Sequence, residues 1–308
     1  LTYIMEIMIA VTLAMSMFLM VPRAEASAER LLEVLNTEPS IKDPTKPIVL
    51  LPKAEYKVKG KIEFCKVDFR YPDAEEPVLK NLSFTAMPGK TTAIIGSTGC
   101  GKSTLIALIP RFYDVTSGSI KIDGIDIRNI LLQDLRDRIG LVSQKAFLFS
   151  GTIADNLRFG KEDATEEELW HALEVAQAKN FVMALPDKLY APVEQGGVNF
   201  SGGQRQRLAI ARAIVKKPEI YLFDDSFSAL DFKTDSQLRQ ALKKETVHNT
   251  VIIVAQRVGT ILNADQIIAL NDDGTIAGIG NHNQLMKTCE VYRDIVHSQL
   301  SNEKITYE

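Results

Sequence analysis

A phosphate-binding loop constrains the fold of this chain more than any other feature of its sequence. Residues 96–104 read Gly-Ser-Thr-Gly-Cys-Gly-Lys-Ser-Thr, a complete G-x-x-x-x-G-K-[ST] pattern. An apolar stretch at 92–95 precedes the loop, and a helix is predicted from Lys102 to Ile109. Such a loop binds phosphate when a strand leads into it and a helix N-terminus follows it. The pattern therefore predicts an α/β fold that binds a nucleotide.

Composition limits the other classes of function. The 308 residues are enough for one large domain or two small ones, and an apolar content of 45% supports a real core. The net charge is −3 and the chain has no long basic run, which disfavours a nucleic-acid partner. The cysteines, Cys65, Cys100 and Cys289, are far apart and lack metal-site spacing, as expected of free thiols in a reducing compartment.

The N-terminus has the composition of a membrane helix. Residues 1–22 are apolar apart from Glu6 and a few Thr and Ser, close to the ~20 residues that span a bilayer. No basic start or cleavage site typical of a secretory signal is clear. Charged residues follow from Arg23 onward, which favours an exit on the cytoplasmic side. A buried soluble helix is the alternative. If the span is real, we expect this chain to be part of a longer protein.

The pattern of helices, strands and prolines suggests three parts. Helical spacing from Ala24 ends before Pro39, and several prolines follow. Further helices are predicted at 165–185, behind a Thr-Glu-Glu-Glu cap, and at 201–215. We assign the parts as follows: 1–35, the end of the last membrane helix and its extension; 36–56, a linker; 57–308, a nucleotide-binding domain, with a helical subdomain at about 146–215.

Strand patterns support this assignment. Ile62, Phe64, Val67 and Phe69 fit a half-buried strand, and isoleucines at 120–125 lie in a turn-rich β stretch. The apolar runs at 220–223 and 251–254 are typical of a parallel sheet covered on both faces.

Two carboxylates follow the apolar run at 220–223. Asp224, at the strand tip, suits the shell of a Mg²⁺ ion, and Asp225 is placed where a base could face an attacking water. Alone, two acids after a strand could be a simple turn. With a phosphate loop upstream, we interpret them as a metal and hydrolysis site, in which Lys102 contacts the β and γ phosphates and Ser103 holds Mg²⁺.

Several motifs together resemble an ATP-binding-cassette (ABC) transporter, most closely an exporter half-transporter of the multidrug type. Phe-Ser-Gly-Gly-Gln at 200–204 is similar to the family's signature motif, with Phe where Leu is usual. Leu-Val-Ser-Gln at 141–144, Phe-Arg-Tyr-Pro at 69–72 and Ser-Ala-Leu-Asp at 228–231 resemble its Q-loop, adenine-stacking and D-loop segments. The resemblance implies a RecA-like parallel sheet, an antiparallel β subdomain, an inserted helical subdomain and a preceding transmembrane-helix fragment.

The resemblance also implies a set of site residues. Those expected to act in hydrolysis are Asp225, Gln256, Lys102 and Gln144. Those expected to hold Mg²⁺ are Ser103, Gln144 and Asp224. Those expected to bind ATP are Tyr71, Gly96, Ser97, Thr98, Gly99, Cys100, Gly101, Lys102, Ser103, Thr104, Gln144, Ser201, Gly202, Gly203, Gln204 and Asp231.

Two positions depart from the family's pattern. The catalytic glutamate expected after the Mg²⁺ aspartate is Asp225, one methylene shorter, and the switch histidine is Gln256. A displacement of about 1 Å can cost roughly a hundredfold in rate. Glutamine can donate a hydrogen bond to a γ-phosphate, but unlike histidine it cannot take up a proton or become positively charged. None of the histidines lies in the switch motif: His171, His248, His282 and His297. We expect a site that binds ATP and hydrolyses it slowly.

This combination resembles one subunit of a heterodimeric exporter in a membrane. The implied cofactors are ATP and Mg²⁺, and the implied partner is a second half-transporter whose own site has the usual Glu and His. Ser201 and Gly203 of this chain would complete that site.

Three alternatives stay open. A homodimer slow at both sites would lack an adjacent gene for a second half-transporter. A soluble ABC protein of repair or translation would not need the apolar N-terminus. A regulatory module would bind ATP without any partner stimulating its turnover.

Overall fold

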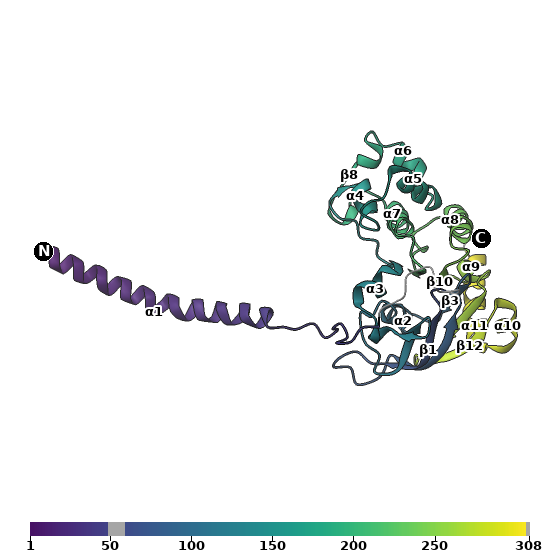
Figure 1. Ribbon diagram of the computed structural model, residues 1–308, viewed down its shortest axis with the longest axis horizontal. Coiled ribbons are helices and arrows are strands. Elements are labelled where there is room, and N and C mark those ends of the chain that lie inside the picture. Colours follow the sequence, from purple (N-terminus) through teal and green to yellow (C-terminus); the bar gives the residue numbers. More distant parts are fainter. Residues whose placement is uncertain (49–58, 306–308) are drawn as a thin grey trace. The chain divides into compact units, whose positions relative to one another are not determined.

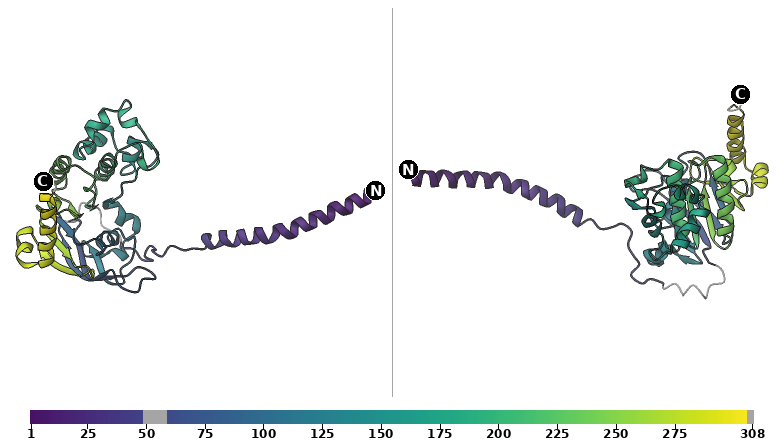
Figure 2. Two further views of the ribbon diagram at one scale, coloured as in Figure 1. Left: turned by 180° about the vertical axis from the view of Figure 1, so that it is seen from behind. Right: turned by 90° about the horizontal axis from the view of Figure 1, so that it is seen from above.

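The computed structural model describes residues 1–48 and 59–305, with side chains described up to residue 299 (Figures 1 and 2). The chain divides into two compact units, Leu1–Lys42 and Asp43–Glu308. The division falls within the predicted linker, whose residues 49–56 lie outside the described residues. The three boundaries assigned from the sequence stay predictions.

The first unit contains one long helix. Helix α1 (Thr2–Leu35) includes Pro22, and an 18-residue window has a mean hydropathy of 2.2 with none of it buried. Its hydroxyl side chains turn back to the helix: Thr12 donates to the Met8 carbonyl at 2.7 Å. By length and composition, α1 is the one described helix able to cross a membrane, a test that a signal sequence or a core helix also passes.

A six-stranded mixed sheet forms the centre of the second unit. Its strand order is β12-β11-β3-β10-β9-β6, with β12 antiparallel to β11 and the other neighbours parallel. Alternate side chains enter two separate cores, as Ala93 and Ile94 do, which confirms burial on both faces. The strands are β3 (Thr91–Ile95), β6 (Ile139–Val142), β9 (Ile220–Asp224), β10 (Thr250–Val254), β11 (Gln266–Leu270) and β12 (Ile276–Gly280).

An antiparallel sheet shares a core with one face of this sheet. Its order is β2-β1-β4-β5: β1 (Ile62–Phe69), β2 (Leu79–Ala86), β4 (Ser117–Ile122) and β5 (Ile125–Asp126). In β1 the buried positions move from Ile62 and Phe64 to Val67 and Phe69, an odd step. A bulge at Lys66, whose φ is 48°, absorbs the step. The predicted strand is therefore confirmed, with both pairs facing inward.

Helices α4 to α7 gather into one lobe, visible in Figure 1 apart from the strands of the two larger sheets. The prediction of one helix over 165–185 is wrong. Gln177 has a φ of 55°, which a regular right-handed helix does not adopt. The Thr165 cap is confirmed as a capping box with Glu168. The lobe contains α4 (Ile153–Arg158), α5 (Glu166–Val175), α6 (Lys179–Met183), α7 (Gly202–Val215), β7 (Gly151–Thr152), β8 (Pro192–Val193) and short 3-10 turns at Lys188–Tyr190 and Gln195–Gly197.

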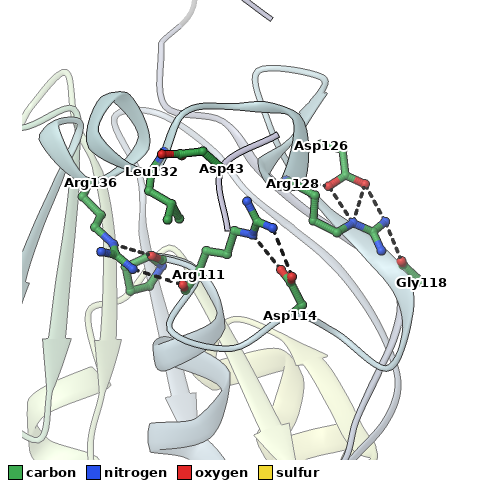
Figure 3. A network of polar contacts seen from close by, with 9 residues as sticks. Asp43, Arg111, Asp114, Gly118, Asp126, Arg128, Leu132 and Arg136 are labelled. Atoms are coloured by element: carbon green, nitrogen blue, oxygen red, sulfur yellow. Dashed lines mark hydrogen bonds and ion pairs between the residues drawn. The ribbon is translucent and has the colours of Figure 1, made fainter. Parts of the chain in front are cut away.

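The remaining helices flank the sheets: α2 (Lys102–Leu108), α3 (Leu132–Asp137), α8 (Phe232–Glu245), α9 (Val258–Ile261), α10 (His282–Thr288), α11 (Glu290–Ile305) and a 3-10 turn at Ile127–Asn129. At the start of α3, the Leu132 N–H donates to Asp43 at 2.7 Å (Figure 3). Ile48 N–H donates to the Asn129 carbonyl at 2.8 Å. The described part of the predicted linker after Lys42 thus lies on the second unit.

Candidate nucleotide site

Four loops that carry predicted site residues leave the same edge of the parallel sheet. The phosphate loop follows β3, Gln144 follows β6, Asp225 follows β9 and Gln256 follows β10. These four strands are neighbours in the order β3-β10-β9-β6. Because the carboxyl ends of parallel strands meet at one edge, residues far apart in sequence are brought into one site.

The phosphate loop has glycine where the backbone is left-handed or where other side chains approach closely. Gly99 and Gly101 have φ values of 92° and 93°, in the left-handed region. A Cβ on Gly101 would lie 2.6 Å from Leu79 Cδ2, and one on Gly96 would lie 2.6 Å from Cys100 Sγ. Cys100 is 2% exposed, and its thiol fills space inside the loop.

Lys102 closes the loop from within. Its side chain is buried, and Nζ donates to the carbonyl oxygens of Gly96 at 2.9 Å and Ser97 at 2.5 Å. Nζ also lies 3.7 Å from Cys100 Sγ. An ammonium held among carbonyls at a helix N-terminus can exchange those partners for phosphate oxygens, so the loop fits a nucleotide phosphate.

Ser103 and Asp224 form the pair predicted to hold Mg²⁺. Ser103 Oγ donates to Asp224 Oδ1 at 3.0 Å. Burial raises the pKa of Asp224 and the nearby charge of Asp225 raises it further, while the Ser103 hydrogen bond and the charge of Lys102 lower it. A partly buried carboxylate of this kind is stabilised by a nearby cation, and hydroxyl and carboxylate oxygens are ligands that Mg²⁺ accepts. The pair therefore fits the ion.

Asp225 joins several elements of the site. Gln144 Nε2 donates to Asp225 Oδ2 at 3.3 Å. The Asp225 N–H donates to the Val254 carbonyl at 3.0 Å, and its own carbonyl accepts from Ser228 Oγ at 2.9 Å. The residue is 8% exposed and its φ is 44°, in the region that Asp tolerates better than most residues. The structure thus brings Gln144 and Asp225 together.

Gln256 lies one strand away, in the exposed turn between β10 and α9. Its carbonyl accepts from Gln299 Nε2 at 2.6 Å. Since Val254 at the end of β10 binds the Asp225 backbone, the two departures from the family's pattern sit on neighbouring strand ends.

Tyr71 lies beside the phosphate loop. Its hydroxyl is 2.9 Å from Thr104 Oγ1, and its ring meets the rings of Phe69 and Tyr113 edge-on. The residue is neither fully buried nor fully exposed. Its predicted role, stacking on adenine, stays a prediction.

The signature motif begins α7. Ser201 is the N-cap: its hydroxyl accepts from Gln204 N–H at 3.2 Å, and Gln204 Oε1 accepts from Ser201 N–H at 2.9 Å. A Cβ on Gly202 would meet nothing within 4 Å, whereas one on Gly203 would lie 3.1 Å from the Ala229 carbonyl. Asp231 is the N-cap of α8, where hydrogen bonds from Thr234 lower its pKa.

Sequence reasoning missed residues that support the site. Gln206 on α7 is 2% exposed and donates to the Ser143 carbonyl at 3.2 Å. Ser226 is fully buried and donates to the Val142 carbonyl at 2.9 Å, and Asp272 accepts from Ser97, which was predicted. The backbone before Gln144 is thus held from two sides. A polar residue on the apolar face of α7 was the available signal for Gln206.

Comparisons with known proteins agree with this geometry. The ABC transporter family model matches residues 79–228. An uncharacterised ABC transporter ATP-binding protein of Mycobacterium bovis is 47% identical over 97% of this chain and 51% of its own length. The putative multidrug export ATP-binding/permease protein YgaD of Bacillus subtilis is 42% identical over 80% of this chain and 42% of its own length.

A solved structure extends the agreement to the fold. A bacterial Atm1-family ABC exporter with ATP bound superposes with a TM-score of 0.83 at 32% identity, over 91% of this chain and 48% of that one. This chain spans about half the length of these relatives. It contains the ATP-binding domain of an ABC transporter and is homologous to ABC exporter half-transporters.

Proposed function

We propose that this chain is the ATP-binding subunit of a heterodimeric ABC exporter, and that its own ATP site is slow. Two cassettes would close around ATP, and hydrolysis at the partner's site would reopen them. The observation that carries the proposal is the combination of Asp225 and Gln256 at one sheet edge with an intact signature at the start of α7.

Different residues of the site would bind different parts of Mg-ATP. Lys102 and the amides of the loop would hold the β and γ phosphates, and Tyr71 would stack on the adenine. Ser103, Asp224 and Gln144 would hold Mg²⁺, which when bound neutralises phosphate charge. Asp231 and the D-loop would face the partner cassette.

Asp225 is poorly placed for a fast reaction. The aspartate side chain is shorter than that of the glutamate usual in the family. Asp225 is 8% exposed, and its carboxylate accepts a hydrogen bond from Gln144. A base displaced by about 1 Å from the attacking water loses roughly a hundredfold, or about 2.7 kcal/mol of barrier. Asp225 therefore orders the site more than it drives hydrolysis.

Gln256 adds to the same deficit. A glutamine amide can donate to a γ-phosphate oxygen but can neither take up a proton nor stabilise developing negative charge with a full positive charge. Both changes keep hydrogen bonding and weaken proton handling. The site would then recognise ATP and hold it.

The signature serves the other site of the dimer. Ser201 and Gly203 lie in the first turn of a 14-residue helix, where N–H groups and the helix dipole favour an anion. In a composite arrangement they would contact the γ-phosphate bound by the partner. This chain would thus be needed for the partner's fast turnover.

The nucleotide-binding domain would lie on the cytoplasmic side of the membrane. A groove on its surface suits contact with a transmembrane domain. It encloses about 270 Å³ and includes exposed Phe149 and Phe159 beside Arg212. Burial lowers the pKa of Arg212, whose guanidinium donates to the Phe147 carbonyl at 3.0 Å and lies over the Phe149 ring. The exposed aromatic rings beside this cation would contact the transmembrane domain.

The experiment that tests the proposal measures steady-state ATPase turnover of this chain without a partner, at a concentration that permits dimerisation. Wild type is compared with the double variant Asp225→Glu, Gln256→His. We expect wild type to bind ATP and barely turn over, and the variant to gain about ten- to a hundredfold, equivalent to about 1.4–2.7 kcal/mol.

The opposite result has a definite meaning. If wild type is already as fast as the variant, Asp225 and Gln256 suffice for hydrolysis and a homodimeric exporter is the better account. Thermal melts of both proteins control for folding, because Glu tolerates the left-handed backbone at 225 less well than Asp.

A further inference from the structure

The loop that carries Gln256 is held by the last helix of the chain. Gln299 on α11 donates from Nε2 to the Gln256 carbonyl at 2.6 Å and accepts at Oε1 from the Val258 N–H at 2.8 Å. A primary amide offers a donor and an acceptor side by side, so one side chain binds the backbone on both sides of Arg257.

The short helix after Gln256 has no cap of its own. Helix α9 has four residues, and its N-cap, Arg257, makes no side-chain capping bond. A helix start leaves backbone N–H groups without intrahelical partners. Gln299 satisfies the N–H of Val258, the first residue of α9, from a distance of 41 residues in sequence. Gln299 therefore caps the N-terminus of α9 from another helix, whereas Ser201 caps α7 from the adjacent position in sequence.

Helix α11 is anchored well enough to act as a support. Tyr292 is fully buried and Val296 is 4% exposed, and both belong to the core on one face of the parallel sheet. The Tyr292 hydroxyl lies 2.8 Å from His282 Nδ1. Steps of four and three residues place Tyr292, Val296 and Gln299 on one helix face. The core thus fixes where the Gln299 amide lies.

We propose that Gln299 is a positioning residue that sets the backbone of Gln256, so that the Gln256 side chain can reach the γ-phosphate of a nucleoside triphosphate. The proposal rests on the proposed nucleotide site. Helix α11 lies outside the residues matched to the family model, 79–228. Through Gln299, helix α11 controls discrimination between ATP and ADP.

The test is a double-mutant cycle on the full chain in detergent. Affinities for Mg-ATP and Mg-ADP are measured by displacement of a fluorescent ATP analogue, for wild type, Gln256→Ala, Gln299→Leu and the double variant. We expect each single change to lower the ATP preference over ADP by about three- to tenfold, the size of one or two net hydrogen bonds. The double variant should lose no more than the worse single variant, because both act through one contact.

Gln284→Leu is the matched control. Gln284 Oε1 accepts from Asn281 N–H at 2.9 Å and caps α10, so the same substitution removes a cap elsewhere. Its thermal midpoint should fall while the ratio of ATP to ADP affinity stays at the wild-type value.

Three results would overturn the proposal. Equal loss of ATP and ADP affinity in Gln299→Leu would mean a structural role only. Additive losses in the double variant would mean that Gln299 does not act through Gln256. A wild-type chain that binds ADP but does not prefer ATP would remove the γ-phosphate contact, whereas a chain that binds neither nucleotide would overturn the nucleotide site itself.

Discussion

The start of α7 and the turn after β10 are both expected to meet a γ-phosphate, yet they are held in different ways. Ser201 and Gln204 cap α7 within four residues of sequence. The turn with Gln256 leads into a helix without its own cap and is bound by Gln299. The locally capped motif keeps the family's polar residues, and the departures, Asp225 and Gln256, follow β9 and β10.

The difference separates two kinds of information. A capping box is formed by residues three apart in sequence, so its geometry follows from local sequence. The position of Gln256 depends on a helix that packs against the core from another part of the chain. If the two regions serve different nucleotides, substitutions in them should affect different steps.

The largest expected effect tests that separation at the binding step. Lys102→Ala should remove nucleotide binding by this chain, with a loss of at least about a hundredfold in affinity, because the ammonium is the loop's only full positive charge placed for the phosphates. Ser201→Ala should leave that affinity unchanged. Equilibrium binding of a fluorescent ATP analogue measures both. Wild-type affinity in Lys102→Ala would contradict the assignment of the phosphate loop.

A second effect concerns turnover in the dimer with its partner. Ser201→Ala should lower ATPase turnover more than Asp225→Glu raises it, by about tenfold against a few-fold, because this signature completes the faster site. Thr165→Ala is the matched control, since Thr165 caps α5 with the same geometry in the same lobe.

Both cap variants should lose about 0.5–2 kcal/mol of stability. Only Ser201→Ala should lose turnover. An equal loss of turnover in Thr165→Ala, or a larger gain from Asp225→Glu, would contradict the composite arrangement.

The smallest expected effect concerns Asp224, which with Ser103 is predicted to hold Mg²⁺. The raised pKa of Asp224 means that its carboxylate opposes folding at neutral pH without a cation, and that this cost disappears as pH falls through the raised pKa, above the ordinary 3.8. Without Mg²⁺, Asp224→Asn should raise the thermal midpoint at pH 7 by about 1–3 °C, since about 1 kcal/mol moves it about 2–4 °C.

That gain should shrink as pH falls through the raised pKa of Asp224, because the wild-type carboxylate is then protonated too. Exposed Asp187→Asn is the control and should change little at any pH. A midpoint of Asp224→Asn below wild type at pH 7 would contradict the assigned cost.

The elements with strong local signals could be predicted from sequence, and their limits show why others could not. The strands at 92–95, 220–223 and 251–254 were predictable because they are short apolar runs between turns. The break between α5 and α6 was not, because the apolar spacing continues across Gln177, which adopts a positive φ where α5 ends and whose carbonyl accepts a hydrogen bond from Arg207 of α7. The site's donor and acceptor pairs, such as Gln144 with Asp225, needed the sheet order.

The sequence by itself determined the phosphate loop, the two acids after β9, the signature with its cap and the identities at 225 and 256, because each is a local pattern with a local physical cause. Only the tertiary structure decided which side chains support them: Gln206 and Ser226 behind Gln144, and Gln299 behind Gln256. These contacts join residues from 43 to 84 positions apart. A side-chain amide or hydroxyl acquires such a partner only when the sheet and its flanking helices have packed.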